Sequence, residues 1–389
     1  MIEPVSARVL TPEWAPTVIP APYDSLTPDE RAQHLATNPD SFAHVAGTPL
    51  ETFGHPSEHL RHATRSTQAL DRLIGLGAFG ATRPPSLYVH CVEADGYAQH
   101  ALLGAVDLDT HELRPHEDTQ PGRVHGLAVH FTEVGRMSSP VVVTAPSLDN
   151  VAEVIEATLA AAGDPSPLEP LLDTKTADGA RVTLWPAVIP SETSVDLEGP
   201  LYIVDGHHRV AAARQAGFTQ VLVALVPASE LHLGSFDREL SELDMMPRRV
   251  ADHMSARCDV VEVSDATEAR PTDPGSVGFG VAGHWFRARR LDVDARADVP
   301  SGVDPARGLD AAFVHDFVLA EIFGVTNASD PRITYRPTSV AIADAPVTIM
   351  LAPVPLRAVF DVADFGGVMP PKTTYFLPKA RSGVLLVRC

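Results

Sequence analysis

One segment, residues 201–213, limits most strongly what this chain can fold into. Its sequence is Leu-Tyr-Ile-Val-Asp-Gly-His-His-Arg-Val-Ala-Ala-Ala. An apolar strand is followed by a polar turn, and a helix begins directly after the turn. Strand–turn–helix units of this kind build sheets covered by helices, so we expect an α/β fold class, more exactly a mixture of α/β and α+β elements.

Elements of both types are predicted along the rest of the chain. Thr27 to Glu30 has the pattern of a helix start, with Thr as N-cap and Glu three residues later. Residues 88–92 and 101–108 are predicted strands around an Asp95-Gly96 turn. Further strands are expected at 181–188, 221–226, 277–289 and 344–352, helices at 150–162 and 309–323, and a hairpin at the end of the chain.

The length of 389 residues suggests two domains. Irregular stretches rich in Pro, Gly and Asp, at 263–276 and 298–308, fall in the second half of the chain. We therefore expect one domain over residues 1–235, which carries the 205–209 turn, and a second α+β domain over residues 236–389.

The composition excludes several classes of protein. The net charge is −20, which disfavours a general nucleic-acid binder because phosphate backbones need a basic face. No apolar run reaches the roughly 18 residues that span a bilayer, and the N-terminal residues lack the apolar core of a signal peptide. The three cysteines are far apart and suggest no disulfide framework. We expect a cytoplasmic protein with neither nucleic-acid nor membrane partners.

The turn at residues 205–209 carries the densest chemistry. Gly206 lets the backbone approach a ligand closely, and the N-terminus of a helix attracts anions. Arg209 can bind phosphate, while His207 and His208 can donate or accept hydrogen bonds near neutral pH. Asp205 can cap the helix, bind a metal or accept a proton. A purely structural role, with Asp205 as helix cap, is the alternative.

Three other segments hold candidate residues. In residues 115–123, Glu117 could bind Mg²⁺ and Arg123 a phosphate. In residues 369–379, Lys372 could neutralise phosphate charge and Thr373 could donate a hydrogen bond. Asp24, before a predicted helix, could be a base or a substrate anchor. Only three of the thirty basic residues are lysines, Lys175, Lys372 and Lys379, and two of them lie in the segment 369–379.

Read together, these segments resemble the bacterial and archaeal family known as domain of unknown function 1015. The resemblance is carried by APYDSLTPDERAQHLATNPDSF (21–42), PSLYVHCVE (85–93), PHEDTQPG (115–122), LYIVDGHHRVAAA (201–213) and MPPKTTYFLPKARSGVLL (369–386). Around the D-G-H-H-R turn, that family is similar to ParB/sulfiredoxin-like nucleotide-binding proteins, which include free-serine kinases. The chain departs from the family's usual residues at 123–125 and 235–238.

The resemblance implies a nucleotide or polyphosphate site at Asp205–Arg209 and a metal-associated role for Glu117. It favours a kinase that transfers a phosphoryl group from ATP, ADP or pyrophosphate, with Mg²⁺, to a hydroxyl amino acid such as L-serine. In that reaction Asp205, Asp24 and His207 are the expected catalytic residues. A ParB-like nucleotide-binding or hydrolysing switch and a non-catalytic ligand-binding protein are the alternatives.

Overall fold

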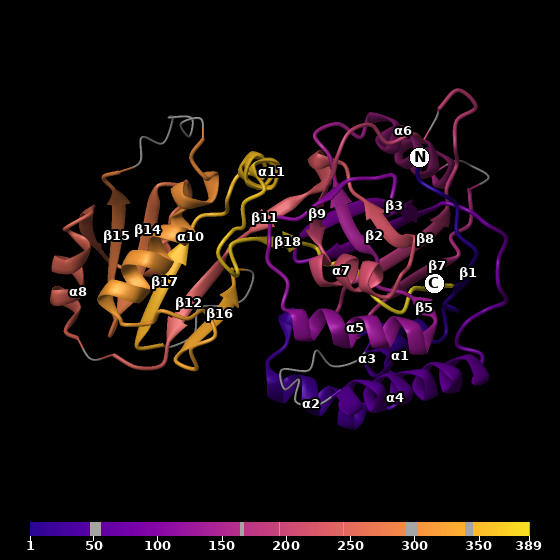
Figure 1. Ribbon diagram of the computed structural model, residues 1–389, viewed down its shortest axis with the longest axis horizontal. Coiled ribbons are helices and arrows are strands. Elements are labelled where there is room, and N and C mark those ends of the chain that lie inside the picture. Colours follow the sequence, from indigo (N-terminus) through magenta and orange to yellow (C-terminus); the bar gives the residue numbers. More distant parts are fainter. Residues whose placement is uncertain are drawn as a thin grey trace. The chain divides into compact units, whose positions relative to one another are not determined.

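The computed structural model describes residues 1–46, 56–163, 167–193, 195–243, 245–292, 302–338 and 345–388. The chain forms two compact units (Figure 1). The first comprises residues 1–114, 119–232 and 377–389, and the second residues 115–118 and 233–376. The sequence suggested a single cut at residue 235, whereas here the end of the chain returns to the first unit and a four-residue segment of the first half belongs to the second.

The first unit is built on a mixed eight-stranded sheet. The strand order is β4-β9-β6-β10-β3-β2-β8-β7, in which β10 runs parallel to β6, and β4 runs parallel to β9. The strands are β2 (Tyr88–Ala94), β3 (Tyr97–Asp107), β4 (Leu113–Arg114), β6 (Val141–Thr144), β7 (Leu172–Lys175), β8 (Arg181–Pro186), β9 (Leu201–Asp205) and β10 (Gln220–Leu225).

Helices cover both faces of this sheet. Residues 221–225 of the central strand β10 are all buried, as expected for a strand covered on both sides. Figure 1 shows α6 across the sheet from α7, with α5 and α4 stacked outside α7. The helices are α1 (Ala15–Val18), α2 (Pro28–Thr37), α3 (Ala43–Ala46), α4 (Pro56–Gly75), α5 (Pro121–Val134), α6 (Asp149–Ala162) and α7 (His207–Gln215).

Local sequence signals explain several of these boundaries. Thr27 and Glu30 form the predicted capping box, in which each side chain accepts from the other residue's backbone N–H. Asp95 and Gly96 both have positive φ, at 56° and 82°, which allows the tight turn between β2 and β3. The helix predicted at 150–162 is α6, with Gly163 as its C-cap.

A separate three-stranded sheet completes the first unit. Its order is β1 (Ala7–Val9), β19 (Leu385–Arg388) and β5 (Arg136–Met137), all antiparallel. The predicted C-terminal hairpin is therefore wrong: β19 pairs with strands from the beginning and the middle of the chain, not with its neighbour β18 (Tyr375–Leu377), which pairs with β11 (His232–Gly234).

The second unit is an antiparallel six-stranded sheet with helices against it. The strand order is β13-β15-β14-β17-β12-β16, and a cluster of buried apolar side chains joins the sheet to α8, α10 and the π-helical segment Val314–Ile322 (Figure 1). The remaining bounds are β12 (Phe236–Leu240), β13 (Cys258–Val263), β14 (Ser276–Val281), β15 (His284–Arg290), β16 (Ile333–Pro337), β17 (Val347–Leu351), α8 (Pro247–Met254), α9 (Ala266–Ala269), α10 (Asp310–Phe313) and α11 (Leu356–Phe365).

The mixed α/β class predicted from the sequence is confirmed by these sheets and helices. The ParB/sulfiredoxin-like description of the first half stays a prediction. Within the described residues, none of the helices has the length and apolar character needed to cross a bilayer.

Candidate functional site

The turn between β9 and α7 places Asp205 at the end of a buried strand and Gly206 at the N-cap of the helix. Gly206 has φ of 105°, a conformation that side-chain-bearing residues rarely adopt. A Cβ atom at this position would lie 3.0 Å from the Arg209 guanidinium carbon. Glycine is thus required twice, by its backbone conformation and by the close approach of Arg209.

Two cations converge on the carboxylate of Asp205. Arg209 Nη2 forms an ion pair with Oδ2, and Lys379 Nζ lies 3.4 Å from Oδ1. Arg209 is held further by a hydrogen bond from Nη1 to the carbonyl oxygen of Pro140, just before β6. The N-cap of α7 is Gly206, so Asp205 does not occupy the cap position that the structural alternative gave it.

The surrounding charges keep Asp205 ionised. Burial alone would raise its pKa, but the attraction of Lys379, and next of Arg209, outweighs burial and lowers the pKa well below its usual value of 3.8. The carboxylate therefore remains negative and fixes both cations in place.

The group can be reached from solvent. The side chains of Asp205, Arg209 and Lys379 are 36%, 20% and 14% exposed. Two positive side chains face one negative side chain, and the N-terminus of α7 adds its own partial positive charge. The turn is thus locally positive in a chain of net charge −20, which is the condition for holding an oxyanion.

The two histidines of the turn differ in their surroundings. His208 Nε2 accepts a hydrogen bond from the backbone N–H of Gln120, 3.1 Å away, at the N-cap of α5. His207 is buried, and its interaction with Asp205 helps to lower the pKa of that carboxyl, after the larger effects of burial, Lys379 and Arg209. His208 thus joins the start of α7 to the start of α5, whose first turn contains Arg123.

Parts of two other predicted segments, residues 115–118 and 369–376, meet within the second unit. Thr374 Oγ1 lies 3.3 Å from His116 Nε2 and donates to Glu117 Oε1, also at 3.3 Å. The N–H of Met369 donates to the carbonyl oxygen of His116. Segments 115–118 and 369–376 therefore interlock, although they are about 250 residues apart in sequence.

Lys372 and Thr373 also belong to this second cluster. Lys372 is exposed, has φ of 58°, and places Nζ 4.7 Å from the centre of the Phe236 ring. Thr373 is buried, and its hydroxyl donates to the carbonyl oxygen of Pro370. Their predicted role as phosphate ligands, like the metal-binding role of Glu117, stays a prediction.

The described residues do not fit a resident Mg²⁺ ion at the turn. Both oxygens of Asp205 are already bound by cationic side chains, and a third cation there would be repelled. No group of three or more His, Cys, Asp or Glu side chains suited to a metal occurs in the described part of the chain. The expectation that Asp205 assists a metal ion is not supported by this arrangement.

The backbone of Asp24 lies in a short 3₁₀ turn, Tyr23–Ser25, but its side chain lies outside the described part of the structure. Lys379 was missed as a site residue. The clustering of lysines in 369–379 is a signal for this segment, but it does not distinguish Lys379 from Lys372.

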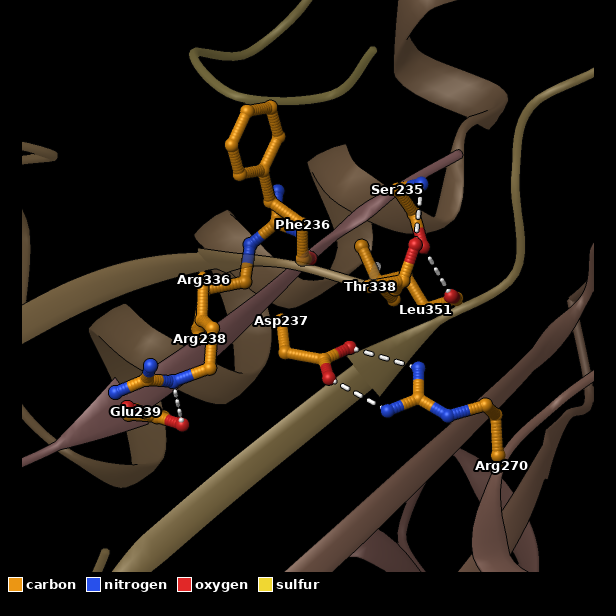
Figure 2. A network of polar contacts seen from close by, with 9 residues as sticks. All are labelled: Ser235, Phe236, Asp237, Arg238, Glu239, Arg270, Arg336, Thr338 and Leu351. Carbon is orange, nitrogen blue, oxygen red and sulfur yellow. Dashed lines mark hydrogen bonds and ion pairs between the residues drawn. The ribbon is translucent and has the colours of Figure 1, made fainter. Parts of the chain in front are cut away.

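Residues 235–239 take part in a network of polar contacts (Figure 2). Arg270 binds both oxygens of Asp237, at 3.1 and 2.7 Å, and Arg336 Nε lies 2.7 Å from Glu239. Ser235 donates from its hydroxyl to the carbonyl oxygen of Leu351. All residues of β12 are buried, so these ion pairs and hydrogen bonds lie in the interior of the second unit.

Comparisons with solved structures found partial similarities of fold. SbnI with C-terminal truncation from Staphylococcus aureus has a TM-score of 0.39 at 13% identity, over 74% of this chain and 84% of that one. A free serine kinase in complex with AMP has a TM-score of 0.35 at 13% identity, over 71% and 87%. A conserved hypothetical protein from Pyrococcus furiosus has 0.35 at 12%, over 74% and 94%. Scores this low carry no argument about function.

A comparison with curated proteins found no match. A family model, however, matches residues 2–312, which is well over half of the chain and includes the segments 21–42, 85–93, 115–122 and 201–213 on which the resemblance rested. The chain therefore belongs to the family described as "Protein of unknown function (DUF1015)".

Proposed function

We propose that the turn at residues 205–209 binds the phosphate groups of a nucleotide or of pyrophosphate, and that the protein transfers one phosphoryl group to a small hydroxyl compound such as L-serine. One observation carries the proposal: Lys379 and Arg209 converge on the single carboxylate of Asp205 at the N-terminus of α7. This is a partly exposed, preassembled positive site of the kind that phosphoryl transfer requires.

Binding would exchange one set of partners for another. An incoming phosphate oxygen would compete with Asp205 for Lys379 Nζ, which is the longer of the two ionic contacts at 3.4 Å. Arg209 would stay fixed by the carbonyl oxygen of Pro140 and could present its guanidinium edge to a second oxygen. Backbone N–H groups of the first turn of α7 would add charge stabilisation without reorganisation.

The same exchange would prepare Asp205 to accept a proton. While Lys379 and Arg209 both bind it, its lowered pKa makes it a weak base. Once a phosphate draws Lys379 away, the pKa rises toward its usual range. The acceptor's hydroxyl oxygen then forms a bond to the terminal phosphorus, the bond from phosphorus to the leaving phosphate oxygen breaks, and the hydroxyl proton passes to Asp205.

The remaining predicted residues have supporting places in this proposal. Asp24 is the alternative proton acceptor. Arg123 lies in the first turn of α5, and His208 contacts the N-cap residue of that helix, Gln120. We propose Arg123 as a further phosphate ligand. Glu117 is proposed as a metal ligand, and Lys372 and Thr373 as phosphate ligands.

Phosphorus NMR tests the proposal directly. The protein is incubated with ATP, ADP or pyrophosphate and a panel of hydroxylated amino acids, with Mg²⁺ and with chelator. We expect a new phosphomonoester signal with at least one donor and one acceptor. Replacing the carboxylate by an amide, Asp205→Asn, should reduce this signal by more than 100-fold while the unfolding transition persists, because the proton acceptor and the anchor of both cations are lost together.

The outcomes separate the candidate functions. Donor hydrolysis that is indifferent to any acceptor would instead support a nucleotide-hydrolysing switch. Absence of any phosphate or nucleotide binding would support a non-catalytic family member and refute the proposal. Full activity in Asp205→Asn would remove Asp205 from the mechanism.

A further inference from the structure

Lys379 lies in a segment without regular secondary structure, residues 378–384, which connects β18 to β19. Because these residues belong to neither a helix nor a strand, the contacts of individual residues determine where Lys379 lies. We propose that Arg381, two residues further on, is a positioning residue, which holds this segment so that the Lys379 ammonium group meets Asp205. The inference rests on the proposed function, in which Lys379 binds phosphate.

The Arg381 side chain is 3% exposed and joins the segment to two distant parts of the first unit. Its Nη2 lies 2.8 Å from Oδ2 of Asp178, in the turn between β7 and β8. Its Nη1 donates to the carbonyl oxygen of Pro20 at 3.2 Å. Asp178 in turn accepts a hydrogen bond of 2.6 Å from the hydroxyl of Thr176. Two acceptors on different parts of the chain thus bind one planar guanidinium group, which fixes its orientation as well as its position.

The ion pair between Arg381 and Asp178 is charged at neutral pH. Burial would raise the pKa of Asp178, but the hydrogen bond from Thr176, and next the charge of Arg381, outweigh burial and lower the pKa below its usual 3.8. A histidine near this pair, His90, is neutral, because burial, and next the charge of Arg381, lower its pKa from 6.5 to about 4. The anchor therefore persists over the pH range in which phosphoryl transfer would be assayed.

Weaker contacts hold the segment on either side of Lys379. Before it, Gln99 Nε2 donates to the carbonyl oxygen of Leu377 at 3.4 Å. After it, the N–H of Gly383 donates to the Ser138 hydroxyl at 2.8 Å. Both are hydrogen bonds between neutral groups, whereas Arg381 contributes a charge-assisted contact of 2.8 Å. We therefore assign the largest constraint on the segment to Arg381.

The contact that this constraint serves is sensitive to small shifts. Lys379 Nζ lies 3.4 Å from Asp205 Oδ1, and its flexible four-carbon stem does not by itself hold the ammonium group in one place. In catalytic sites, a displacement of about 1 Å can cost about 100-fold in rate. The same guanidinium group also binds the carbonyl oxygen of Pro20, four residues before Asp24, the alternative proton acceptor. Loss of Arg381 should thus disturb Lys379 first.

Side-chain NMR tests the positioning without any ligand. The chain has three lysines, so labelling with ¹³C,¹⁵N-lysine gives three side-chain signals, and the one missing from Lys379→Met belongs to Lys379. The variant Asp205→Asn shows how this signal moves when the ion pair is lost. We expect Arg381→Met to move it in the same direction and by a comparable amount. An unchanged Lys379 signal in folded Arg381→Met would overturn the proposal.

Pyrophosphate affinity, measured by titration calorimetry of the full chain, tests the consequence for binding. Arg381→Met should weaken binding by about 10–100-fold, because the charge-assisted contact of Lys379 is lost. The double variant with Lys379→Met should bind no more weakly than Lys379→Met alone, since Arg381 acts through Lys379. Losses that multiply would contradict this role. If the parent protein binds no pyrophosphate, the proposed function fails, while the NMR result still decides the role of Arg381.

Arg181→Met is the matched control. Arg181 follows the same turn between β7 and β8 and forms a 2.9 Å ion pair with Asp173, but their side chains are 48% and 39% exposed. It should change neither the Lys379 signal nor the affinity for pyrophosphate, and effects equal to those of Arg381→Met would refute a specific role. If Arg381→Met does not fold, Asp178→Asn replaces it, because the Asp178 side chain is 30% exposed. The Lys379 signal should then move in the same direction, and an unchanged signal would again overturn the proposal.

Discussion

The turn after β9 and the strand β12 use the same ingredients, carboxylates held by arginines, but differ in what surrounds them. At the turn, the Asp205 side chain is 36% exposed and has two cations. In β12, the side chains of Asp237 and Glu239 are 2% and 6% exposed, and they form ion pairs with Arg270 and Arg336. Exposure combined with a surplus of cations leaves the turn able to accept another anion, whereas the buried carboxylates of β12 are already matched.

The difference also separates binding from stability. A buried carboxylate that loses its arginine stays in a low-dielectric environment without compensation. A partly exposed carboxylate that loses one of two cations keeps the other and gains water. Substitutions in β12 should therefore affect folding, and substitutions at the turn should affect ligand binding.

The largest effect is expected for Arg270→Met, which leaves Asp237 buried without its bidentate partner. The free energy of unfolding should fall by about 3–5 kcal/mol, measured by urea denaturation. Burial already raises the pKa of Asp237, and Arg270 opposes that rise, so without Arg270 the pKa should rise further. The loss should accordingly be smaller at low pH, where Asp237 takes up a proton.

The control for this prediction is Arg357→Ala in the same unit. Arg357 is 84% exposed and pairs with Asp361 one helical turn away, so its loss should cost less than about 0.5 kcal/mol. If Arg270→Met cost no more than Arg357→Ala, the contrast between a buried and an exposed ion pair would fail.

The second prediction concerns Lys379→Met. Affinity for ATP or pyrophosphate should fall by about 10–100-fold, the effect of losing one charge-assisted contact of 1.5–3 kcal/mol, while stability changes by less than about 1 kcal/mol because Arg209 still pairs with Asp205. Titration calorimetry and denaturation measure the two quantities. Lys175→Met, an exposed lysine of the same unit, should change neither. Equal loss of affinity in both variants would indicate a general charge effect instead.

Part of the candidate site could be predicted from the sequence because it is local. Asp205, Gly206 and Arg209 lie within one strand–turn–helix unit, and the order of residue types determines their neighbourhood. Lys379 is 174 residues from Asp205, so no periodicity could select it over Lys372. The lysine bias identified the right segment, and only the fold determined that Lys379 meets the carboxylate.

The same limit explains the errors in the fold. Helix α6 and the turn between β2 and β3 are specified by caps and turn residues that are adjacent in sequence. Strand β19 was predicted to pair with its neighbour, because consecutive strands usually pair. Its actual partners, β1 and β5, have only three and two residues, and a strand of four residues does not encode which distant edge it joins.

A third, smaller effect is expected for Gly206→Ala. The alanine would have to adopt φ of 105° with its Cβ 3.0 Å from the Arg209 guanidinium, which should cost about 1–3 kcal/mol of stability and displace Arg209 from Asp205.

Gly217→Ala is a matched control at the other end of α7, since Gly217 has φ of 77° but no atom within 4 Å of an added Cβ. Both variants should lose stability, measured by urea denaturation. Only Gly206→Ala should also lose pyrophosphate affinity, and similar affinity in the two variants would show that the close approach of Arg209 is unimportant.

The smallest effect tests an ion pair that is intermediate between the two regions. His100 Nδ1 lies 3.3 Å from Glu230, with side chains 20% and 31% exposed. Hydrogen bonding to Cys91, and next to Glu230, raises the pKa of His100 from its usual 6.5 to about 10. Because the folded-state pKa is the higher one, the contribution to stability is complete below about pH 6.5 and is lost as pH rises through about 10. The partial exposure limits this contribution to about 1 kcal/mol.

Denaturation at pH 6 and pH 9.5 should show this decline in the parent protein and a flatter profile in His100→Gln. An equal decline in both would show that another group causes the pH dependence. The partly exposed pair of His100 and Glu230 would then contribute no more to stability than an ion pair on the surface.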